Sequence, residues 1–513
     1  MSDRIFIGGG GQDYAEAQTL LLDKSNRHGL IAGATGTGKT VTLQILAEGF
    51  SANGVPVFLS DVKGDLSGLA ASGSETFKLH DAFMKRAATI KLDLHYDKFP
   101  VTFWDLFGKQ GHPIRATVAE MGPLLLSRLL ELTDVQEGVM NVAFRVADEE
   151  GLPLLDLKDL QALLVWVGQH ASDLSLRYGN VASSSVGAIQ RQLLVIENQG
   201  GAALFGEPAL DLADLMRTDT DGRGMINILA ADQLMGSPRL YATFLLWLLS
   251  ELFEVMPEVG NPDEPKLVFF FDEAHLLFDD APKALVDKVE QVARLIRSKG
   301  VGVYFITQNP ADVPDDILSQ LGNRVQHALR AFTAKDRKEL KLAAKTYRDN
   351  PLFDTATAIQ EVGTGEAVTS MLDAKGIPTV VERTLIRPPA SQLGPLSVSE
   401  RKAIMASSPM AGKYDTTIDR ESASEILAKR AGAAGVEAEK AEAEEERVEE
   451  KEREFKSARR YSGNGTKGRS TSRRSSNDTS FGGAIASVIA KELKGTTGRR
   501  IVRGILGGLF RGR

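Results

Sequence analysis

Residues 33–40 read Gly-Ala-Thr-Gly-Thr-Gly-Lys-Thr. A loop that turns its backbone N–H groups inward around an anion needs glycines, because a Cβ atom would block that curvature. A lysine followed by a threonine supplies an ammonium for the β and γ phosphates of a nucleotide and a hydroxyl ligand for Mg²⁺. We therefore predict a phosphate-binding loop for ATP and Mg²⁺. Its predicted nucleotide-binding residues are Gly33, Ala34, Thr35, Gly36, Thr37, Gly38, Lys39, Thr40 and Val41.

Two adjacent carboxylates follow a second apolar run. Residues 266–275 read Lys-Leu-Val-Phe-Phe-Phe-Asp-Glu-Ala-His, which is typical of a buried strand that ends in Asp272 and Glu273. We expect Asp272 and Thr40 to hold Mg²⁺, and Glu273 to polarise the attacking water. The alternative is an acidic strand end that caps the next helix. Together with the loop, the pair predicts an enzyme that hydrolyses the nucleotide.

Three more polar residues are candidates for catalysis. Gln308 ends the apolar run at residues 301–307, where it could hydrogen-bond the γ-phosphate or the lytic water; otherwise it caps the strand. Arg324 and Arg330 stand at either end of a predicted strand at residues 325–329. In an oligomer, one of them could reach a neighbour's γ-phosphate, but each could equally be a surface ion-pair residue.

A third apolar run, at residues 57–59, leads into Ser-Asp-Val-Lys-Gly-Asp-Leu. In a doubly wound sheet the carboxyl ends of the strands face the ligand crevice. Asp61, Lys63 and Asp65 could therefore lie beside the nucleotide or on the path of a substrate. A turn with an aspartate cap explains them equally well, and the sequence does not choose between the two interpretations.

These residues need a scaffold of alternating strands and helices. The pattern of the first 390 residues predicts an α/β fold with a largely parallel sheet. A strand at residues 30–32 precedes the loop, and a helix at residues 41–50 follows it. Leucines at helical spacing predict a helical insertion. The predicted strands are residues 56–60, 224–229, 267–271, 301–307, 325–329 and 367–372.

The predicted order of parts is a first half of the ATPase core (1–106), the helical insertion (107–215) and a second half of the core (216–390). A charged helical linker follows at residues 391–460, with ten Glu between residues 437 and 454. Residues 461–480 are rich in Ser, Gly, Asn and Arg and are expected to be disordered. Residues 481–513 predict a basic amphipathic helix for a membrane surface, nucleic acid or a partner subunit, or a helix folded onto the body.

The composition of the chain indicates its cellular compartment and the charge of its surface. The 513 residues contain no cysteine, which fits a reducing compartment. The first residues lack the pattern of a signal peptide, and the apolar stretches are too short to span a bilayer, so we expect a cytoplasmic protein. From Lys456 onward there are fourteen Lys or Arg and two acidic residues, which leaves residues 1–455 with a net charge of −19. Any contact of this acidic body with nucleic acid must be a local patch or a pore lining.

The order of these motifs resembles the HerA/FtsK branch of the additional-strand P-loop ATPases. The motifs are Gly-Ala-Thr-Gly-Thr-Gly-Lys-Thr, Asp-Val-Lys-Gly-Asp, a helical insertion, Phe-Phe-Asp-Glu-Ala-His, Thr-Gln-Asn-Pro and Asn-Arg-Val. Residues 26–40 and the Gly-His-Pro-Ile-Arg of residues 111–115 are similar to bacterial YjgR-like proteins, a HerA-type group. The resemblance implies a RecA/ASCE-like P-loop NTPase fold. It covers about residues 5–390 and the basic terminal helix.

Members of this branch form hexameric rings that move DNA or polypeptide, with an arginine acting between subunits. The resemblance therefore implies a homo-oligomer, a hexamer in the family pattern, and an ATPase motor that acts on DNA. HerA helicases carry an N-terminal β-barrel that helps to assemble the ring, whereas here the phosphate loop begins at Gly33. This departure bears on ring assembly and translocation and not on ATP hydrolysis. The alternatives are an ATPase that acts on protein or at a membrane, and a phosphotransferase that uses ATP.

Overall fold

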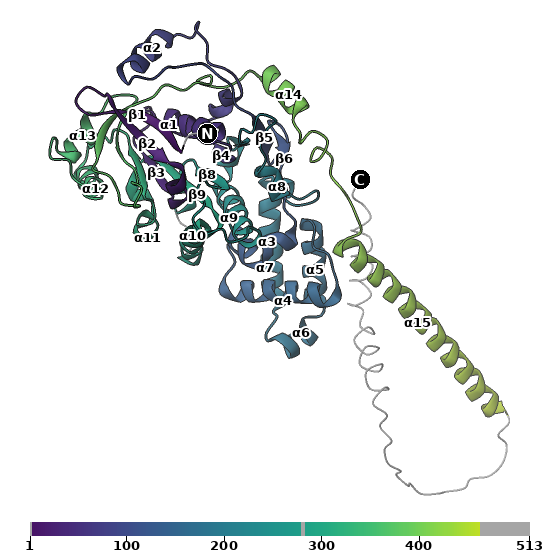
Figure 1. Ribbon diagram of the computed structural model, residues 1–513. Helices are drawn as coiled ribbons and strands as arrows, with labels where there is room; N and C mark the ends of the chain where they lie inside the picture. Colours follow the sequence, from purple (N-terminus) through teal and green to yellow (C-terminus); the bar gives the residue numbers. More distant parts are fainter. Residues whose placement is uncertain (1–2, 279–282, 462–513) are drawn as a thin grey trace. The chain divides into compact units, whose positions relative to one another are not determined.

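The structure is a computed structural model that describes residues 3–278 and 283–461 (Figure 1). The chain divides into two compact units, Met1–Ala434 and Gly435–Arg513. All of the candidate site residues belong to the first unit. The predicted terminal helix at residues 481–513 and all but Tyr461 of the predicted disordered segment at residues 461–480 lie outside the described residues.

The described part of the first unit contains one twelve-stranded sheet, in the order β2–β1–β12–β11–β10–β3–β9–β8–β4–β7–β5–β6. The run from β10 to β6 is parallel throughout, whereas β11, β12, β1 and β2 are antiparallel to their neighbours. The strands are β1 (Arg4–Gly10), β2 (Glu16–Leu21), β3 (Gly29–Ala32), β4 (Val57–Asp61), β5 (Val101–Asp105), β6 (His112–Pro113), β7 (Ile226–Ala230), β8 (Leu267–Phe271), β9 (Val301–Thr307), β10 (Asn323–Gln326), β11 (Glu366–Ser370) and β12 (Glu382–Ile386).

The central strands are apolar on both faces. Every residue of β8, Leu-Val-Phe-Phe-Phe, is buried, and so is every residue of β9. A parallel strand covered on both sides is expected to be continuously apolar, because helices pack on each face of the sheet. The first polar side chains after these strands therefore stand at the carboxyl edge of the sheet, where β3, β9, β8 and β4 end side by side.

Helices cover the sheet and form the insertion. The insertion between β6 and β7 consists of α3 to α8, and capping boxes begin α3 at Thr117, α4 at Thr133 and α5 at Asp156. The helices are α1 (Lys39–Ala52), α2 (His80–Thr89), α3 (Val118–Leu129), α4 (Asp134–Glu150), α5 (Leu157–Gln169), α6 (Ala171–Tyr178), α7 (Ser183–Asn198), α8 (Leu212–Leu215), α9 (Pro238–Val255), α10 (Lys283–Ile296), α11 (Asp315–Leu318), α12 (Ala334–Lys345), α13 (Thr355–Glu361), α14 (Val398–Ser407) and α15 (Ala423–Tyr461).

Most predicted strands exist with small shifts. β8 and β9 have the predicted bounds, and β4, β7 and β11 differ by one or two residues. The strand predicted at residues 325–329 is wrong at both ends, because the sheet pairing of β10 covers only Asn323–Gln326. Arg324 therefore lies inside this strand and Arg330 lies beyond it. The sequence pattern did not predict β1, β2, β5, β6 or β12.

Residues 391–434 belong to the first unit, which extends to Ala434. Met410 and Tyr414 are buried in the same core as the insertion. The Asp415 carboxylate lies 2.8 Å from Nδ1 of His112, and the Arg115 guanidinium donates to the Tyr414 carbonyl at 3.0 Å. The block at residues 111–115, which the sequence singled out without a chemistry, thus anchors the returning chain. Along residues 3–278 and 283–461, no helix has the length and apolarity needed to cross a membrane.

Candidate functional site

The phosphate loop joins β3 to α1. Gly33, Gly36 and Gly38 all have positive φ, at 150°, 77° and 121°. A Cβ at Gly33 would lie 2.5 Å from Cβ of His327, so only glycine fits there. The backbone is fixed from outside as well, since the Ala34 N–H donates to the Ala328 carbonyl at 2.8 Å. The loop is therefore seated against the chain that leaves β10.

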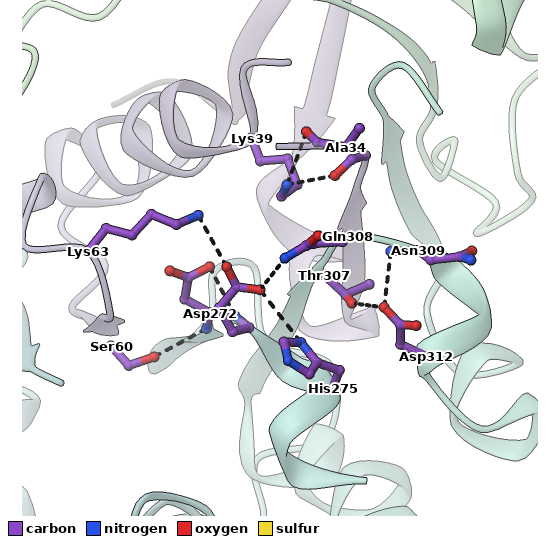
Figure 2. A network of polar contacts seen from close by, with 12 residues as sticks. Ala34, Lys39, Ser60, Lys63, Asp272, His275, Thr307, Gln308, Asn309 and Asp312 are labelled. Atoms are coloured by element: carbon purple, nitrogen blue, oxygen red, sulfur yellow. Dashed lines mark hydrogen bonds and ion pairs between the residues drawn. The ribbon is translucent and has the colours of Figure 1, made fainter. Parts of the chain in front are cut away.

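Lys39 begins α1 and is buried, with 6% of its surface exposed. Its Nζ donates to the carbonyls of Gly33 at 2.6 Å and Ala34 at 3.3 Å, inside the loop (Figure 2). Burial lowers the pKa of Lys39, and the nearby Lys63 ammonium lowers it further. A buried ammonium held only by carbonyls gains from an anion, so its position suits a phosphate. Thr40 follows it on the first turn of the same helix.

Asp272 directly follows β8, and a small network fixes its backbone. Ser60, on the neighbouring strand β4, accepts from the Asp272 N–H at 3.2 Å, and Tyr241 donates to the Asp272 carbonyl at 2.9 Å. The two hydroxyls are 2.7 Å apart. Burial and, second, the adjacent Glu273 carboxylate together raise the pKa of Asp272 to about 7. A divalent cation would favour the charged carboxylate, which makes Asp272 suitable as a ligand or an orienting group for Mg²⁺.

Glu273 is 7% exposed and has a left-handed backbone conformation, with φ +48°. Such a φ is uncommon outside glycine and costs on the order of 1 kcal/mol or more. Its Oε1 lies 3.1 Å from Nζ of Lys63. Its Oε2 lies 3.5 Å from both Nε2 of Gln308 and Nδ1 of His275 (Figure 2). The strained backbone thus directs a buried carboxylate toward three polar groups from three different segments.

The loop after β4 brings Lys63 to Glu273. The Asp61 carboxylate accepts the backbone N–H groups of Gly64, Asp65 and Leu66, at 2.8, 3.2 and 3.0 Å. Burial and, second, the nearby Asp65 carboxylate together raise the pKa of Asp61 to about 6. The capping interpretation of Asp61 is therefore confirmed. Lys63, which the sequence left undecided, reaches the site: burial lowers its pKa, but the ion pair with Glu273 outweighs that and raises it overall.

Gln308 follows β9, which lies between β3 and β8. Its exposed side chain faces Glu273, and hydrogen bonds to Asp312 hold the residues on either side of it (Figure 2). Asp312 accepts from the Thr307 hydroxyl at 2.6 Å and from the Asn309 N–H at 3.0 Å. The strand between the loop strand and the strand of the acidic pair thus places the Gln308 amide beside the Glu273 carboxylate. The role of Gln308 as a sensor of the γ-phosphate or the lytic water stays a prediction.

A comparison with known protein families shows to which family the chain belongs. A family model described as "Helicase HerA-like C-terminal" matches residues 10–513. The chain belongs to the HerA-like C-terminal family. The HerA resemblance that the motifs indicated is thus confirmed. No curated protein sequence matches the chain.

Several solved structures are similar to this chain. VirB4 of Thermoanaerobacter pseudethanolicus has a TM-score of 0.50 at 14% identity, over 75% of this chain and 97% of that chain. The unbound bacterial conjugative coupling protein TrwBdeltaN70 gives 0.47 at 14% identity, over 77% and 92%. Plasmid coupling protein TrwB in complex with ADP and Mg²⁺ gives 0.43 at 16% identity, over 72% and 88%. The VirB4 likeness confirms the predicted α/β P-loop ATPase fold with its mostly parallel sheet.

The two candidate arginines of this HerA-type chain lie apart from the acidic pair. Arg324 is the second residue of β10, level with Leu30 of β3, and its guanidinium donates to the carbonyls of Leu321 and Leu318. Arg330 is exposed and donates to the Gln360 carbonyl at 2.6 Å. Because Arg330 follows the carboxyl end of β10, it stands nearer to the edge that carries the loop. Which arginine acts between subunits stays a prediction.

Sequence reasoning missed His327, which lies behind the phosphate loop. This buried histidine follows β10; its Nε2 lies 2.8 Å from the Thr42 hydroxyl of α1, and its Nδ1 donates to the Glu366 carbonyl at 2.9 Å. Burial lowers the pKa of His327 to about 4, so the ring is neutral and can accept from Thr42. A histidine in an apolar run next to the Asn-Arg-Val motif was the available signal.

The described residues of the HerA-type site fit ATP and Mg²⁺. The chain provides a glycine cradle, a buried ammonium and a hydroxyl beside it, and a buried carboxylate. In the described parts of the chain, no cluster of three or more His, Cys, Asp or Glu could hold a metal by itself. Mg²⁺ bound through one or two protein groups and substrate phosphates needs no such cluster.

Proposed function

We propose that this chain is a Mg²⁺-dependent ATP hydrolase that works as a cytoplasmic homo-oligomer and acts as a motor on DNA. The observation that carries the proposal is the convergence, at one edge of the sheet, of Lys39 after β3, Gln308 after β9 and Glu273 after β8. A nucleotide-binding protein without hydrolysis would not need a buried base beside a sensor amide. Membership of a family described as helicase supports DNA as the polymer.

Each residue has a defined task in this proposal. Lys39 exchanges its two loop carbonyls for phosphate oxygens, which are stronger acceptors. Thr40 and Asp272 would hold Mg²⁺, whose positive charge would stabilise the negative charge that develops on the phosphate oxygens. Glu273 accepts the proton of the attacking water, and Gln308 orients that water or the γ-phosphate.

An oligomer would complete the site. Phosphoryl transfer gains from a positive group supplied in trans, and the guanidinium of Arg330 is exposed on the loop side of β10. We assign the trans-acting role to Arg330 in preference to Arg324, because the Arg324 guanidinium already donates twice to carbonyls of its own chain.

The test is ATP hydrolysis by the purified chain at two salt concentrations, with and without single- or double-stranded DNA, together with its mass in solution with ATP. Strong, salt-sensitive stimulation of a ring-sized species supports the DNA motor. A small, unstimulated oligomer that hydrolyses ATP would overturn the DNA part and keep the ATPase. A chain that hydrolyses no ATP, or whose ATP hydrolysis is unchanged by Glu273→Gln, would overturn both.

Two alternatives have their own tests. An ATPase at a membrane would use residues 481–513, which lie outside the described residues, and flotation with liposomes would be lost when they are deleted. A phosphotransferase would give a labelled product other than free phosphate from γ-labelled ATP. In that case Glu273 would be the base for an acceptor hydroxyl.

A further inference from the structure

A basic surface stands out on the first unit. Residues 330–348 contain seven Lys or Arg and two acidic residues, within a body whose first 455 residues carry a net charge of −19. The segment begins just after β10 and includes α12. A local patch of this kind is the feature that an acidic body needs in order to hold a polyanion.

The positive charges gather on one face of α12. Leu340 and Ala344 pack in a small core and Ala343 is also buried, whereas four basic residues on the solvent side of the helix are exposed. Arg337, Lys341 and Lys345 recur at every fourth position, so they follow one another along that face. They span about 12 Å, at about 1.5 Å per residue. The exposed basic residues of this face, called the basic face of α12 below, are Arg337, Lys338, Lys341 and Lys345.

This basic face has no acidic partner within the described chain. No ion pair is found there for Arg337, Lys338, Lys341 or Lys345, although Lys335 pairs with Glu339 at 3.6 Å on the same helix. Four like charges along two turns repel one another, and an external anion would relieve that repulsion.

The helix is also connected to the nucleotide site. The side-chain amide of Asn309 donates to the Glu339 carboxylate of α12. Asn309 directly follows Gln308, whose amide faces Glu273 at 3.5 Å. A displacement of α12 would therefore move Asn309, the residue next to Gln308 in the sequence.

We propose that the basic face of α12 holds the phosphate backbone of DNA, and that Glu339 and Asn309 couple this contact to Gln308. The inference rests on the proposed function, because it names the surface by which the motor holds its polymer. DNA suits the face because 12 Å matches about three or four charges of one strand, which are about 3.4 Å apart along the axis. The contact reads no base sequence.

The test compares two triple variants of the full chain. One variant carries Arg337→Gln, Lys341→Gln and Lys345→Gln. The matched control carries Lys85→Gln, Lys98→Gln and Lys402→Gln, which remove the same charge at exposed positions elsewhere on the first unit. Binding of a fluorescent random-sequence duplex is measured by anisotropy over about 0.05 to 0.2 M salt. ATP hydrolysis without DNA and the mass in solution are measured in parallel.

We expect the α12 variant to bind the duplex about tenfold more weakly at low salt, with its salt slope reduced by about 2.7. Its hydrolysis without DNA and its mass should match the control. Equal binding by both variants would overturn this inference and leave the DNA motor standing. Absence of duplex binding by the unmodified chain would overturn both. A lower mass of the α12 variant alone would instead assign the face to the acidic surface of a second copy.

A single substitution tests the coupling. Glu339→Ala removes the acceptor of the Asn309 amide and leaves the basic face intact. We expect unchanged duplex affinity with loss of at least half of the DNA stimulation of hydrolysis. Full stimulation in this variant would contradict the route through Asn309. Glu339→Gln, which keeps an acceptor oxygen, should restore most of it.

Discussion

An aspartate stands at the carboxyl end of each of two neighbouring strands, β4 and β8, and the two aspartates have different roles. The Asp61 carboxylate after β4 accepts three backbone N–H groups of its own loop. The Asp272 carboxylate after β8 accepts one, from Glu273 at 3.0 Å. A carboxylate saturated by backbone donors is a structural cap, whereas one with spare lone pairs beside a second carboxylate is available for a cation. At this edge of the sheet, the number of backbone N–H groups that a carboxylate accepts therefore distinguishes the structural residue, Asp61, from the residue available for a cation, Asp272.

The largest expected effect is that of replacing Glu273, the proposed general base. Glu273→Gln removes the proton acceptor while it keeps the volume and one acceptor oxygen of the side chain. We expect hydrolysis to fall by about 10³-fold, with ATP still bound, because general base and charge effects of this kind contribute about 10²–10⁴-fold. Single-turnover assays with labelled ATP measure both quantities. Lys39→Ala provides the contrast, since it should lose binding and turnover together.

Asp272 should make stability depend on pH in the nucleotide-free protein. Its pKa is about 7 in the folded chain, raised from an ordinary value of 3.8. The folded state therefore binds more protons than the unfolded state between about pH 4 and pH 7, and stability falls as the pH rises through that window. Asp272→Asn removes this penalty, so its melting temperature should exceed that of the unmodified protein at pH 8 and approach it near pH 4.

A control sharpens this second prediction. Asp221→Asn changes an exposed turn aspartate and should leave the pH dependence as it was. Mg²⁺ with a non-hydrolysable ATP analogue should raise the melting temperature of the unmodified protein at pH 8 more than that of Asp272→Asn. An identical pH dependence of stability in both aspartate variants would refute the assignment of the window to Asp272.

Asp61 should behave as a scaffold residue. Asp61→Ala leaves three loop N–H groups without their acceptor, and we expect a loss of about 2 kcal/mol in the free energy of unfolding. Asp65→Ala is the matched control, because its side chain accepts none of these bonds. Denaturant unfolding measures the difference. If Asp61→Ala keeps full stability and loses only hydrolysis, the division between cap and chemistry is wrong.

The sequence was a good guide to groups that a single segment carries. The phosphate loop, the acidic pair and Gln308 stand directly after buried strands, so motif spacing was enough to find them. The contacts that join separate segments were not accessible in this way. His327 behind the loop, Lys63 against Glu273 and Asn309 against Glu339 depend on strand order and loop geometry. Strands β1 and β12 were missed because their pairing joins the two ends of the first 390 residues.

Lys63 gives the smallest expected effect and links the two strand ends. Its ammonium lies 3.1 Å from one oxygen of the Glu273 carboxylate, and its raised pKa keeps the ammonium charged throughout the neutral range. Lys63→Met frees that oxygen to accept a proton from water, so we expect kcat without DNA to rise about two- to fivefold with KM unchanged. Lys63→Arg, which keeps the charge, should behave as the unmodified chain. A fall in kcat for Lys63→Met would mean that the ion pair orients Glu273 for reaction, and the loop capped by Asp61 would then belong to the chemistry as fully as the end of β8.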